Sequence, residues 1–377
     1  MPGLYLHIPF CKKACHYCNF HFSTSLQSKD ELLAALHREL ALQRDYLGGQ
    51  RLDTVYLGGG TPSLLSTAEL VALFDAIERI YTVSEGAEIT LEANPDDLDA
   101  EKVNDLRAYT PVNRLSIGIQ SFRDEDLRWM NRAHQARESH ACLERVAGAG
   151  FDNWTADLIY GLPGGSDRDW ADNIRTLLDY GVPHISAYCL TIEEGTALHH
   201  FVKKGKEKPV DEETALRQFE YLMQALEAEG FQHYEISNFA RPGRLSRHNS
   251  NYWLGEPYLG IGPSAHSYDI GSRQWNVGNN ARYIRSLQEN TVPFEREQIT
   301  PVMRYNEYVM TRLRTHWGCL PDDIRAFGAS FYEHFEREAT QFAAQNLLQR
   351  DAQGAWQLTR SGKFRADGLA ASLFMTE

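Results

Sequence analysis

Three cysteines close to the N-terminus are the residues of this sequence best suited to chemistry. Cys11, Cys15 and Cys18 follow the pattern Cys-x-x-x-Cys-x-x-Cys. Soft thiolates at such short spacing select an iron–sulfur cluster or zinc. Structural zinc usually takes four ligands in two pairs, and no second cysteine pair is present, although His16 and His21 could complete a zinc site. Three thiolates on a four-iron cluster would instead leave one iron open to a substrate or cofactor.

Further polar or glycine elements follow four other apolar segments. Glycines let a ligand approach the backbone N–H groups, carboxylates can hold hydroxyl or ammonium groups, and arginine pairs with carboxylates. Each element alone also fits a turn, a helix cap or a surface carboxylate. Their recurrence at the ends of successive strands favours an active site, because barrel sites are built at that edge. The elements are Gly58-Gly59-Gly60-Thr61-Pro62, Glu92, Gln120, Arg132 and Asp157.

The elements that must position these residues alternate between strand and helix. Six strand–helix units in succession predict a parallel sheet with helices outside. A closed eight-unit barrel needs about 250 residues, whereas these units occupy roughly 200, so we predict an open (β/α)6 partial barrel of the TIM type. The predicted strands are 4–8, 54–57, 89–92, 114–119, 155–159 and 185–190.

Helix signals separate these strands. A capping box of Ser28 and Glu31 predicts the start of the first helix, and Gly48 is its predicted end. Asp211 is the predicted cap of a later amphipathic helix. Further helices are expected over 66–81, 137–147, 166–180 and 211–229.

The chain is expected to have three parts. Residues 1–230 form the barrel, and residues 231–300, rich in Gly, Pro and aromatic residues, form a linking region of loops. Residues 301–377 return to a helical pattern and end in a short strand over 356–359, which predicts a smaller, mainly helical C-terminal domain.

Composition limits the class of protein. The net charge of -13 argues against nonspecific nucleic-acid binding, which needs clustered Lys and Arg. No apolar run is long enough to span a membrane, and the N-terminus lacks the pattern of a secretory signal, so a cytoplasmic protein is expected. Cys142, Cys189 and Cys319 are expected to be small core residues.

The cysteine pattern resembles the signature of the radical S-adenosylmethionine (SAM) superfamily. In that family the open iron chelates SAM, and an electron from the [4Fe–4S] cluster cleaves SAM to methionine and a 5'-deoxyadenosyl radical. The surrounding Tyr5-x-His7-Ile8-Pro9-Phe10-Cys11 resembles the branch that contains oxygen-independent coproporphyrinogen III oxidase (HemN) and the HemW-like heme chaperones. The resemblance implies that SAM contacts Tyr5, Tyr17, Gly59, Gly60, Thr61, Glu92, Gln120, Arg132 and Asp157.

Two features favour the chaperones over the oxidase. The oxidase has the pattern Cys-x-x-x-Cys-x-x-Cys-x-Cys and a long N-terminal extension. In this sequence Phe20 stands at the position of the fourth cysteine, and Cys11 lies ten residues from the start. The segment His248-Asn249-Ser250-Asn251-Tyr252-Trp253 matches the HNxxYW motif of HemW-like proteins. A neutral imidazole is a strong heme-iron ligand, so His248 is the preferred axial ligand and His266 the second candidate.

The resemblance therefore predicts a heme chaperone that transfers heme to an acceptor hemoprotein. Its cofactors would be a [4Fe–4S] cluster, SAM and heme, with a flavodoxin- or ferredoxin-type electron donor. The alternative is an oxygen-independent coproporphyrinogen III oxidase, so the sequence leaves open whether the chain is an enzyme. The C-terminal segments Asn306-Glu307-Tyr308 and Leu358-Thr359-x-x-Gly362 resemble the accessory domain of the same branch.

Overall fold

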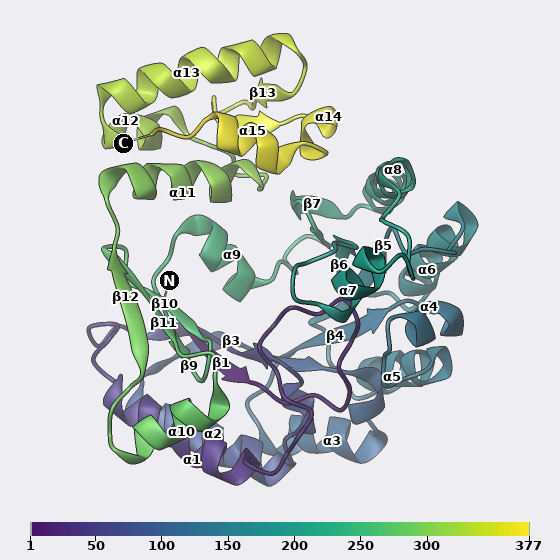
Figure 1. Ribbon diagram of the computed structural model, residues 1–377, viewed down its shortest axis with the longest axis vertical. Coiled ribbons are helices and arrows are strands. Elements are labelled where there is room, and N and C mark those ends of the chain that lie inside the picture. The colour runs from purple at the N-terminus through teal and green to yellow at the C-terminus, as the bar shows by residue number, and fades with distance from the viewer. Residues whose placement is uncertain (1, 377) are drawn as a thin grey trace.

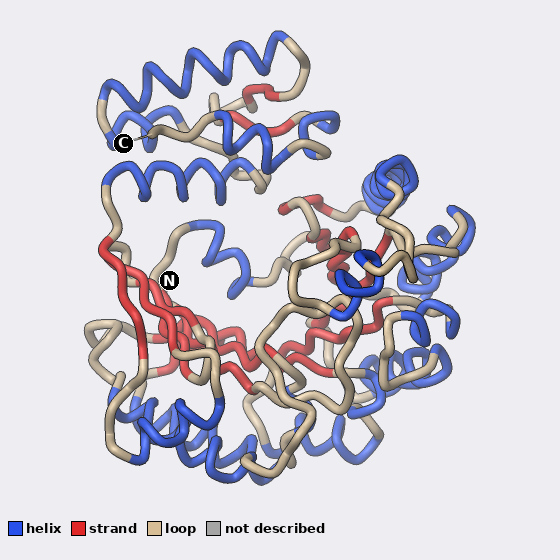
Figure 2. The backbone as a smooth tube through the Cα atoms, in the orientation of Figure 1, coloured by secondary structure: helices blue, strands red, loops and turns tan. Residues whose placement is uncertain are grey.

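Six parallel strands in chain order form the centre of one large sheet in the computed structural model, which describes residues 2–376 (Figures 1 and 2). Leu4, Leu6 and Ile8 are fully buried, as strands covered on both faces require. The six strands confirm the prediction. They are β1 (Gly3–Ile8), β2 (Leu52–Gly59), β3 (Val83–Ala93), β4 (Arg114–Gln120), β5 (Trp154–Tyr160) and β6 (His184–Cys189).

Helices connect these strands and cover the outer face of the sheet (Figure 1). Leu32, Leu36 and Leu40 form the buried stripe of the first helix, at the spacing that faces a core. The helices are α1 (Lys29–Leu42), α2 (Thr67–Ile80), α3 (Ala100–Tyr109), α4 (Asp124–Trp129), α5 (Ala136–Gly148), α6 (Asp167–Asp179), α7 (Ala197–Lys203) and α8 (Glu212–Ala228), with 3-10 turns η1 (Pro62–Leu64) and η2 (Pro95–Asp97).

The two predicted ends of the first helix were wrong in detail. Ser28 precedes α1, but its backbone (φ -101°, ψ 20°) is not extended and its side chain caps nothing, so no capping box forms. The helix ends at Leu42 rather than at Gly48, because a series of turns follows it. Asp211 occupies the N-cap of α8 as predicted, and its carboxylate accepts a hydrogen bond from the Thr214 hydroxyl.

Residues 231–300 do not consist of loops as predicted, since they contain six strands and two helices. The strands extend the sheet at both edges: β8 pairs with β6, and β9 pairs with β1 in parallel. These strands have three to five residues, too few for periodicity to reveal them. The elements are β7 (Gln232–Glu235), β8 (Asn238–Ala240), α9 (Arg247–Leu254), β9 (Tyr258–Ile261), β10 (His266–Tyr268), β11 (Ser272–Asn276), α10 (Asn280–Gln288) and β12 (Phe294–Gln298).

The sheet is an open α/β barrel. Its strand order runs from β12 at one edge to β7 at the other, and these two edge strands do not pair with each other within residues 2–376. In the same part of the chain, no helix is both long enough and apolar enough to cross a membrane.

The C-terminal residues form a mainly helical unit with a hydrophobic core of its own, built around Tyr305, Val309 and Phe335 (Figure 1). The predicted final strand is present as β14. The elements are α11 (Pro301–Leu313), α12 (Pro321–Phe327), α13 (Ala329–Ala344), β13 (Leu348–Arg350), β14 (Trp356–Leu358), α14 (Arg360–Lys363) and α15 (Ala366–Ser372).

Candidate functional site

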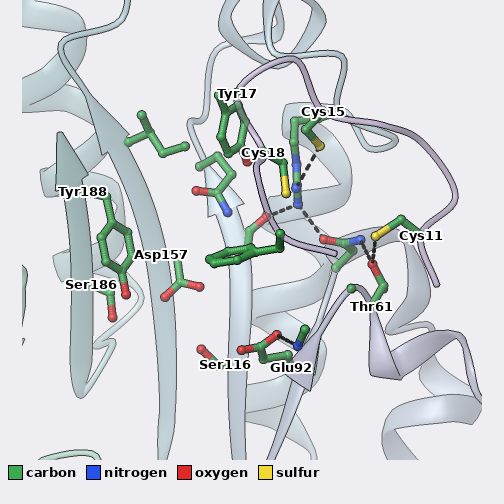
Figure 3. Close-up of a pocket in the computed structure, with 18 of the residues that line it drawn as sticks. Cys11, Cys15, Tyr17, Cys18, Thr61, Glu92, Ser116, Asp157, Ser186 and Tyr188 are labelled. Atoms are coloured by element: carbon green, nitrogen blue, oxygen red, sulfur yellow. Dashed lines mark hydrogen bonds between the residues drawn. The ribbon is translucent and has the colours of Figure 1, made fainter. Parts of the chain in front are cut away.

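The carboxyl ends of the parallel strands surround a cavity of about 430 Å³, here called the first cavity. All three N-terminal cysteines line it, from the loop that follows β1 (Figure 3). Its size lies within the usual range of small-molecule sites, about 300–1,000 Å³. The barrel thus brings the cysteines and the strand-end residues to one place.

Backbone hydrogen bonds fix the cysteine loop at its start and in its middle. The Cys11 N–H donates to the Ser23 carbonyl (3.0 Å), and the His16 N–H donates to the Met130 carbonyl (3.1 Å). The Lys12 ammonium also forms ion pairs with Asp96 and Asp97 in η2. The loop is therefore held from two neighbouring parts of the barrel.

The three thiols are free and partly exposed to the cavity. The Thr61 hydroxyl lies 3.5 Å from Cys11 Sγ, and Arg132 Nη1 lies 3.5 Å from Cys15 Sγ. Burial raises the pKa of Cys11 to about 11 and also raises the pKa of Cys18. Because thiols bind metals as thiolates, loading an iron–sulfur cluster here must release protons.

The histidines of the zinc alternative do not line the first cavity. His16 Nδ1 bonds to the Trp129 carbonyl (2.7 Å), and His21 Nε2 bonds to Asn280 Oδ1 (2.7 Å). Within residues 2–376, no three His, Cys, Asp or Glu side chains gather closely enough for a single metal ion. Three cysteines that share their cavity with no histidine among the described residues would suit an iron–sulfur cluster better than structural zinc, which usually takes four ligands.

The glycine segment at the end of β2 packs against the start of the cysteine loop. A Cβ on Gly60 would lie 2.7 Å from the Phe10 carbonyl oxygen, and one on Gly59 would lie 2.5 Å from the His7 ring. Gly59 also has a φ of +104°, a conformation that side chains disfavour. Glycine is thus required so that β2 can approach the segment preceding Cys11.

Two carboxylates extend into the cavity from β3 and β5 (Figure 3). Glu92 accepts hydrogen bonds from the Tyr56 hydroxyl (2.8 Å) and the Gly59 N–H (3.0 Å), and burial raises its pKa. Burial, together with the negative charge of Glu92, raises the pKa of Asp157 to about 7. Such an acidic wall suits a ligand with cationic and hydroxyl groups.

Arg132 is held across the end of β4. Its Nη2 donates to Asn94 Oδ1 (2.5 Å) and to the Gly118 carbonyl (2.8 Å), while its buried Nε has no partner among the described residues. A Cβ on Gly118 would lie 3.1 Å from this guanidinium, so glycine leaves room for it. Gln120 follows with a left-handed backbone (φ +65°), a strained conformation typical of functional sites.

Eight of the ten predicted cofactor-binding residues line the first cavity together with the cysteines. The other two lie elsewhere. Tyr5 lines a second cavity, where its hydroxyl bonds to His7 Nδ1 (3.1 Å). The eight are Tyr17, Gly59, Gly60, Thr61, Glu92, Gln120, Arg132 and Asp157.

His248 lies within the barrel wall, only 1% exposed, and lines neither of these cavities. Nδ1 bonds to the Thr54 hydroxyl and Nε2 to the Tyr252 hydroxyl, each at 2.8 Å. The ring also stacks on Tyr56, with 4.9 Å between centroids. Neither nitrogen is therefore free to bind iron in this structure, which argues against the predicted axial ligand.

Several residues of the site were not predicted from the sequence. Cys142 and Cys319 are buried core residues as expected, but Cys189 lines the first cavity. Asn94, two residues after Glu92, joins Arg132 to Thr61 through its amide, donating to the Thr61 hydroxyl at 3.1 Å. The side chains that alternate along β4 and β6 could have been found from strand periodicity. They are Ser116, Ser186 and Tyr188 (Figure 3).

Comparison with known proteins places the chain in a family. Residues 5–177 match the model of the radical SAM superfamily. The chain is 36% identical to the heme chaperone HemW of Bacillus subtilis over 96% of both chains. It is 32% identical to HemW of Escherichia coli over 100% of this chain and 98% of that one. This chain belongs to the HemW family. The three cysteines and the eight predicted cofactor-binding residues that line the first cavity are thus features of a HemW-family radical SAM protein.

A solved structure shares the fold. Coproporphyrinogen III oxidase (HemN) from Escherichia coli, a radical SAM enzyme, superposes with a TM-score of 0.85 at 23% identity, covering 99% of this chain and 90% of the oxidase. At this identity the likeness establishes the radical SAM fold and says nothing of substrate. The predicted fold class is confirmed.

Proposed function

We propose that this HemW-family protein binds heme and transfers it to an acceptor hemoprotein, and that it holds a [4Fe–4S] cluster and SAM. The cofactor proposal rests on one observation: three free thiols and eight of the predicted cofactor-binding residues, most of them at strand ends, line one cavity. The proposal that the protein binds and transfers heme is supported by relatives that match over nearly their full length at 32–36% identity and are heme chaperones. The cytoplasmic location and a flavodoxin- or ferredoxin-type electron donor belong to the same proposal.

Different residues of the first cavity would bind the cluster and SAM. Cys11, Cys15 and Cys18 would ligate the cluster, which supplies one-electron chemistry when it is bound. Glu92 and Asp157 would bind cationic or hydroxyl groups of SAM, and Arg132 would orient a carboxylate while it keeps Cys15 in place.

Anaerobic reconstitution tests the cluster. The wild type should hold about four irons per chain. Replacing any one of the three loop cysteines by Ala should abolish the cluster, whereas the matched variant Cys142→Ala, in the core and away from the cavity, should retain it. Normal activity in a protein that contains only zinc would refute the cluster.

Calorimetric titration tests the SAM site. Glu92→Gln and Asp157→Asn should weaken SAM binding without loss of iron, because neither carboxylate is a thiolate ligand. Glu101→Gln, on the exposed side of α3, is the matched control. Unchanged SAM affinity in both cavity variants would refute this placement.

Two assays separate the chaperone from the oxidase. Mixing the heme-loaded protein with an apo-hemoprotein should restore the absorption spectrum of the acceptor. Incubation with coproporphyrinogen III, SAM and a reductant should yield no protoporphyrinogen IX. Turnover of coproporphyrinogen III by a chain that binds no heme would favour the oxidase.

A further inference from the structure

A second cavity of about 850 Å³ opens between the sheet and the C-terminal helices. One wall is made by β9, β10 and β11, and the other by α9, α11 and α12. Figure 1 places α9 between the sheet and α11, with the C-terminal unit beyond it. The cavity lies at the upper end of the usual size range of ligand sites and is about twice the volume of the first.

Aromatic side chains dominate this second cavity. Tyr252 and Tyr258 meet edge to face with 4.6 Å between ring centroids, and Tyr258 lies 6.1 Å from Tyr268. Trp253 also lines the cavity, and its buried indole N–H has no hydrogen-bond partner among the described residues. Aromatic walls with an unpartnered donor suit a flat, largely apolar ligand that carries polar groups at its edge.

His266 differs from every other histidine around this cavity. Both ring nitrogens of His7 are bonded, to the Tyr5 hydroxyl and to the His21 carbonyl, and His21 Nε2 is bonded to Asn280. His266 is exposed, and neither of its nitrogens has a hydrogen bond within residues 2–376. Partial desolvation of the ring by its neighbours and the charge of nearby Arg273 lower the pKa of His266, which favours the neutral imidazole that binds metals.

The backbone that carries His266 is rigidly supported. A Cβ on Gly260 would lie 2.0 Å from the His266 carbonyl oxygen, so only glycine allows β9 and β10 to approach this closely. The buried Glu39 accepts hydrogen bonds from the Gly262 N–H (2.8 Å), directly after β9, and from the Asn276 amide (2.7 Å), at the end of β11, and these bonds tie both segments to α1. The imidazole is thus presented from a fixed scaffold, as a metal ligand requires.

The cationic groups of the cavity are unequally available. Arg273 forms ion pairs with Glu297 and Glu307. Arg304, exposed on α11, has no ion pair or hydrogen bond from its guanidinium to any residue described. An unpaired guanidinium is suited to a carboxylate of the ligand.

The two cavities meet at a shared wall. Gly59 and Glu92 line both, and so do Asn19 and Phe20, which follow directly after Cys18. Phe20 is 68% exposed, an unusual state for a large apolar side chain. A ligand in the second cavity would therefore lie beside the cofactors of the first, with Phe20 between them.

We propose that heme occupies the second cavity, with His266 as its axial iron ligand and Arg304 facing a propionate. This inference rests on the proposed heme binding and assigns its place. The iron would bind a ring nitrogen of His266, the porphyrin plane would pack on the tyrosines of α9 and β9, and a propionate would lie toward α11. His248 would act only through Tyr252, which it holds by a hydrogen bond.

Heme titration of the full-length protein, followed by the Soret difference spectrum, tests this assignment. His266→Ala should shift the Soret band and weaken heme binding by more than about tenfold, the loss that even outer partners of metal ligands cause. Added imidazole should restore the wild-type spectrum. His200→Ala, on the exposed end of α7, is the matched control and should behave like the wild type.

A second variant tests the propionate contact. Arg304→Gln should weaken the binding of heme but leave the binding of heme dimethyl ester unchanged, because the ester has no charge to pair. Iron content and circular dichroism of each variant check that the cluster and the fold persist. Equal effects of Arg304→Gln on the two ligands would overturn the propionate assignment.

The outcomes separate this inference from the function on which it rests. If the wild type binds heme and His266→Ala retains its spectrum and affinity, the second cavity is wrong and the proposed function stands. If His248→Ala loses the axial signature while His266→Ala keeps it, the ligand is His248 and the assignment fails. If the wild type binds no heme at all, both proposals fail.

Discussion

Gly60 offers a direct test of how the strand ends support the cysteine loop. Its N–H donates to the Ile8 carbonyl (2.9 Å), at the point where β2 meets the segment leading to Cys11. A Cβ added at Gly60 would lie 2.7 Å from the carbonyl oxygens of Ile8 and Phe10 and 2.8 Å from the Phe10 nitrogen. All three are backbone atoms, so Gly60→Ala must displace the chain itself.

The cost of this displacement follows from the packing. Extra methyl groups in a tightly packed region usually cost about 1–3 kcal/mol, and we expect Gly60→Ala to lower the free energy of unfolding by about 2 kcal/mol. The same shift should move Cys11, the next residue after Phe10, and reduce the iron content after reconstitution. Gly148→Ala is the control: this residue ends α5, and a Cβ there meets nothing within 4 Å. It should leave stability unchanged or raise it by up to about 1 kcal/mol.

Two measurements check the expectation. Urea unfolding of the cluster-free protein gives the difference in free energy, and iron and sulfide analysis after anaerobic reconstitution gives the cluster content. A Gly60→Ala protein that matches Gly148→Ala in both would refute the view that β2 sets the position of Cys11.

Other predictions follow from the same structure. Since the pKa of Asp157 is raised to about 7, its carboxylate gains charge as pH rises through that value, so affinity for cationic SAM should increase between about pH 6 and 8. Calorimetry should find this rise absent in Asp157→Asn. Burial raises the pKa of Glu39 from 4.5 to about 7, so the folded state binds more protons than the unfolded state between those two pH values. The free energy of unfolding should therefore decrease as pH rises from about 4.5 to 7. Urea midpoints of Glu39→Gln should lack this decline. Arg132→Lys should lose cluster on dilution, because one ammonium cannot replace contacts to Cys15, Asn94 and Gly118, and an iron content equal to that of the wild type would contradict this.

Local patterns predicted the central architecture well. The apolar runs within β1 to β6 are mostly buried, so their periodicity and their bounding turns were visible in the sequence. Because parallel strands end at a common edge, the order of Glu92, Gln120 and Asp157 along the chain was enough to predict a shared site. The short strands of residues 231–300 were missed because their ladders depend on partners distant in sequence, such as β1 for β9.

The sequence by itself determined which functional groups could take part in chemistry: three thiols at cluster spacing, a glycine segment, and carboxylates and an arginine near strand ends. Only the tertiary structure decided which side chains are free to use it. His248 and His266 are both imidazoles in aromatic surroundings, yet Thr54, 194 residues away, occupies one nitrogen of His248, whereas His266 remains unbonded. Cys189 likewise reached the first cavity because β6 ends there. Whether a side chain is free to bind a ligand depends on the residues packed around it, and long-range packing, which no local sequence pattern encodes, determines those residues.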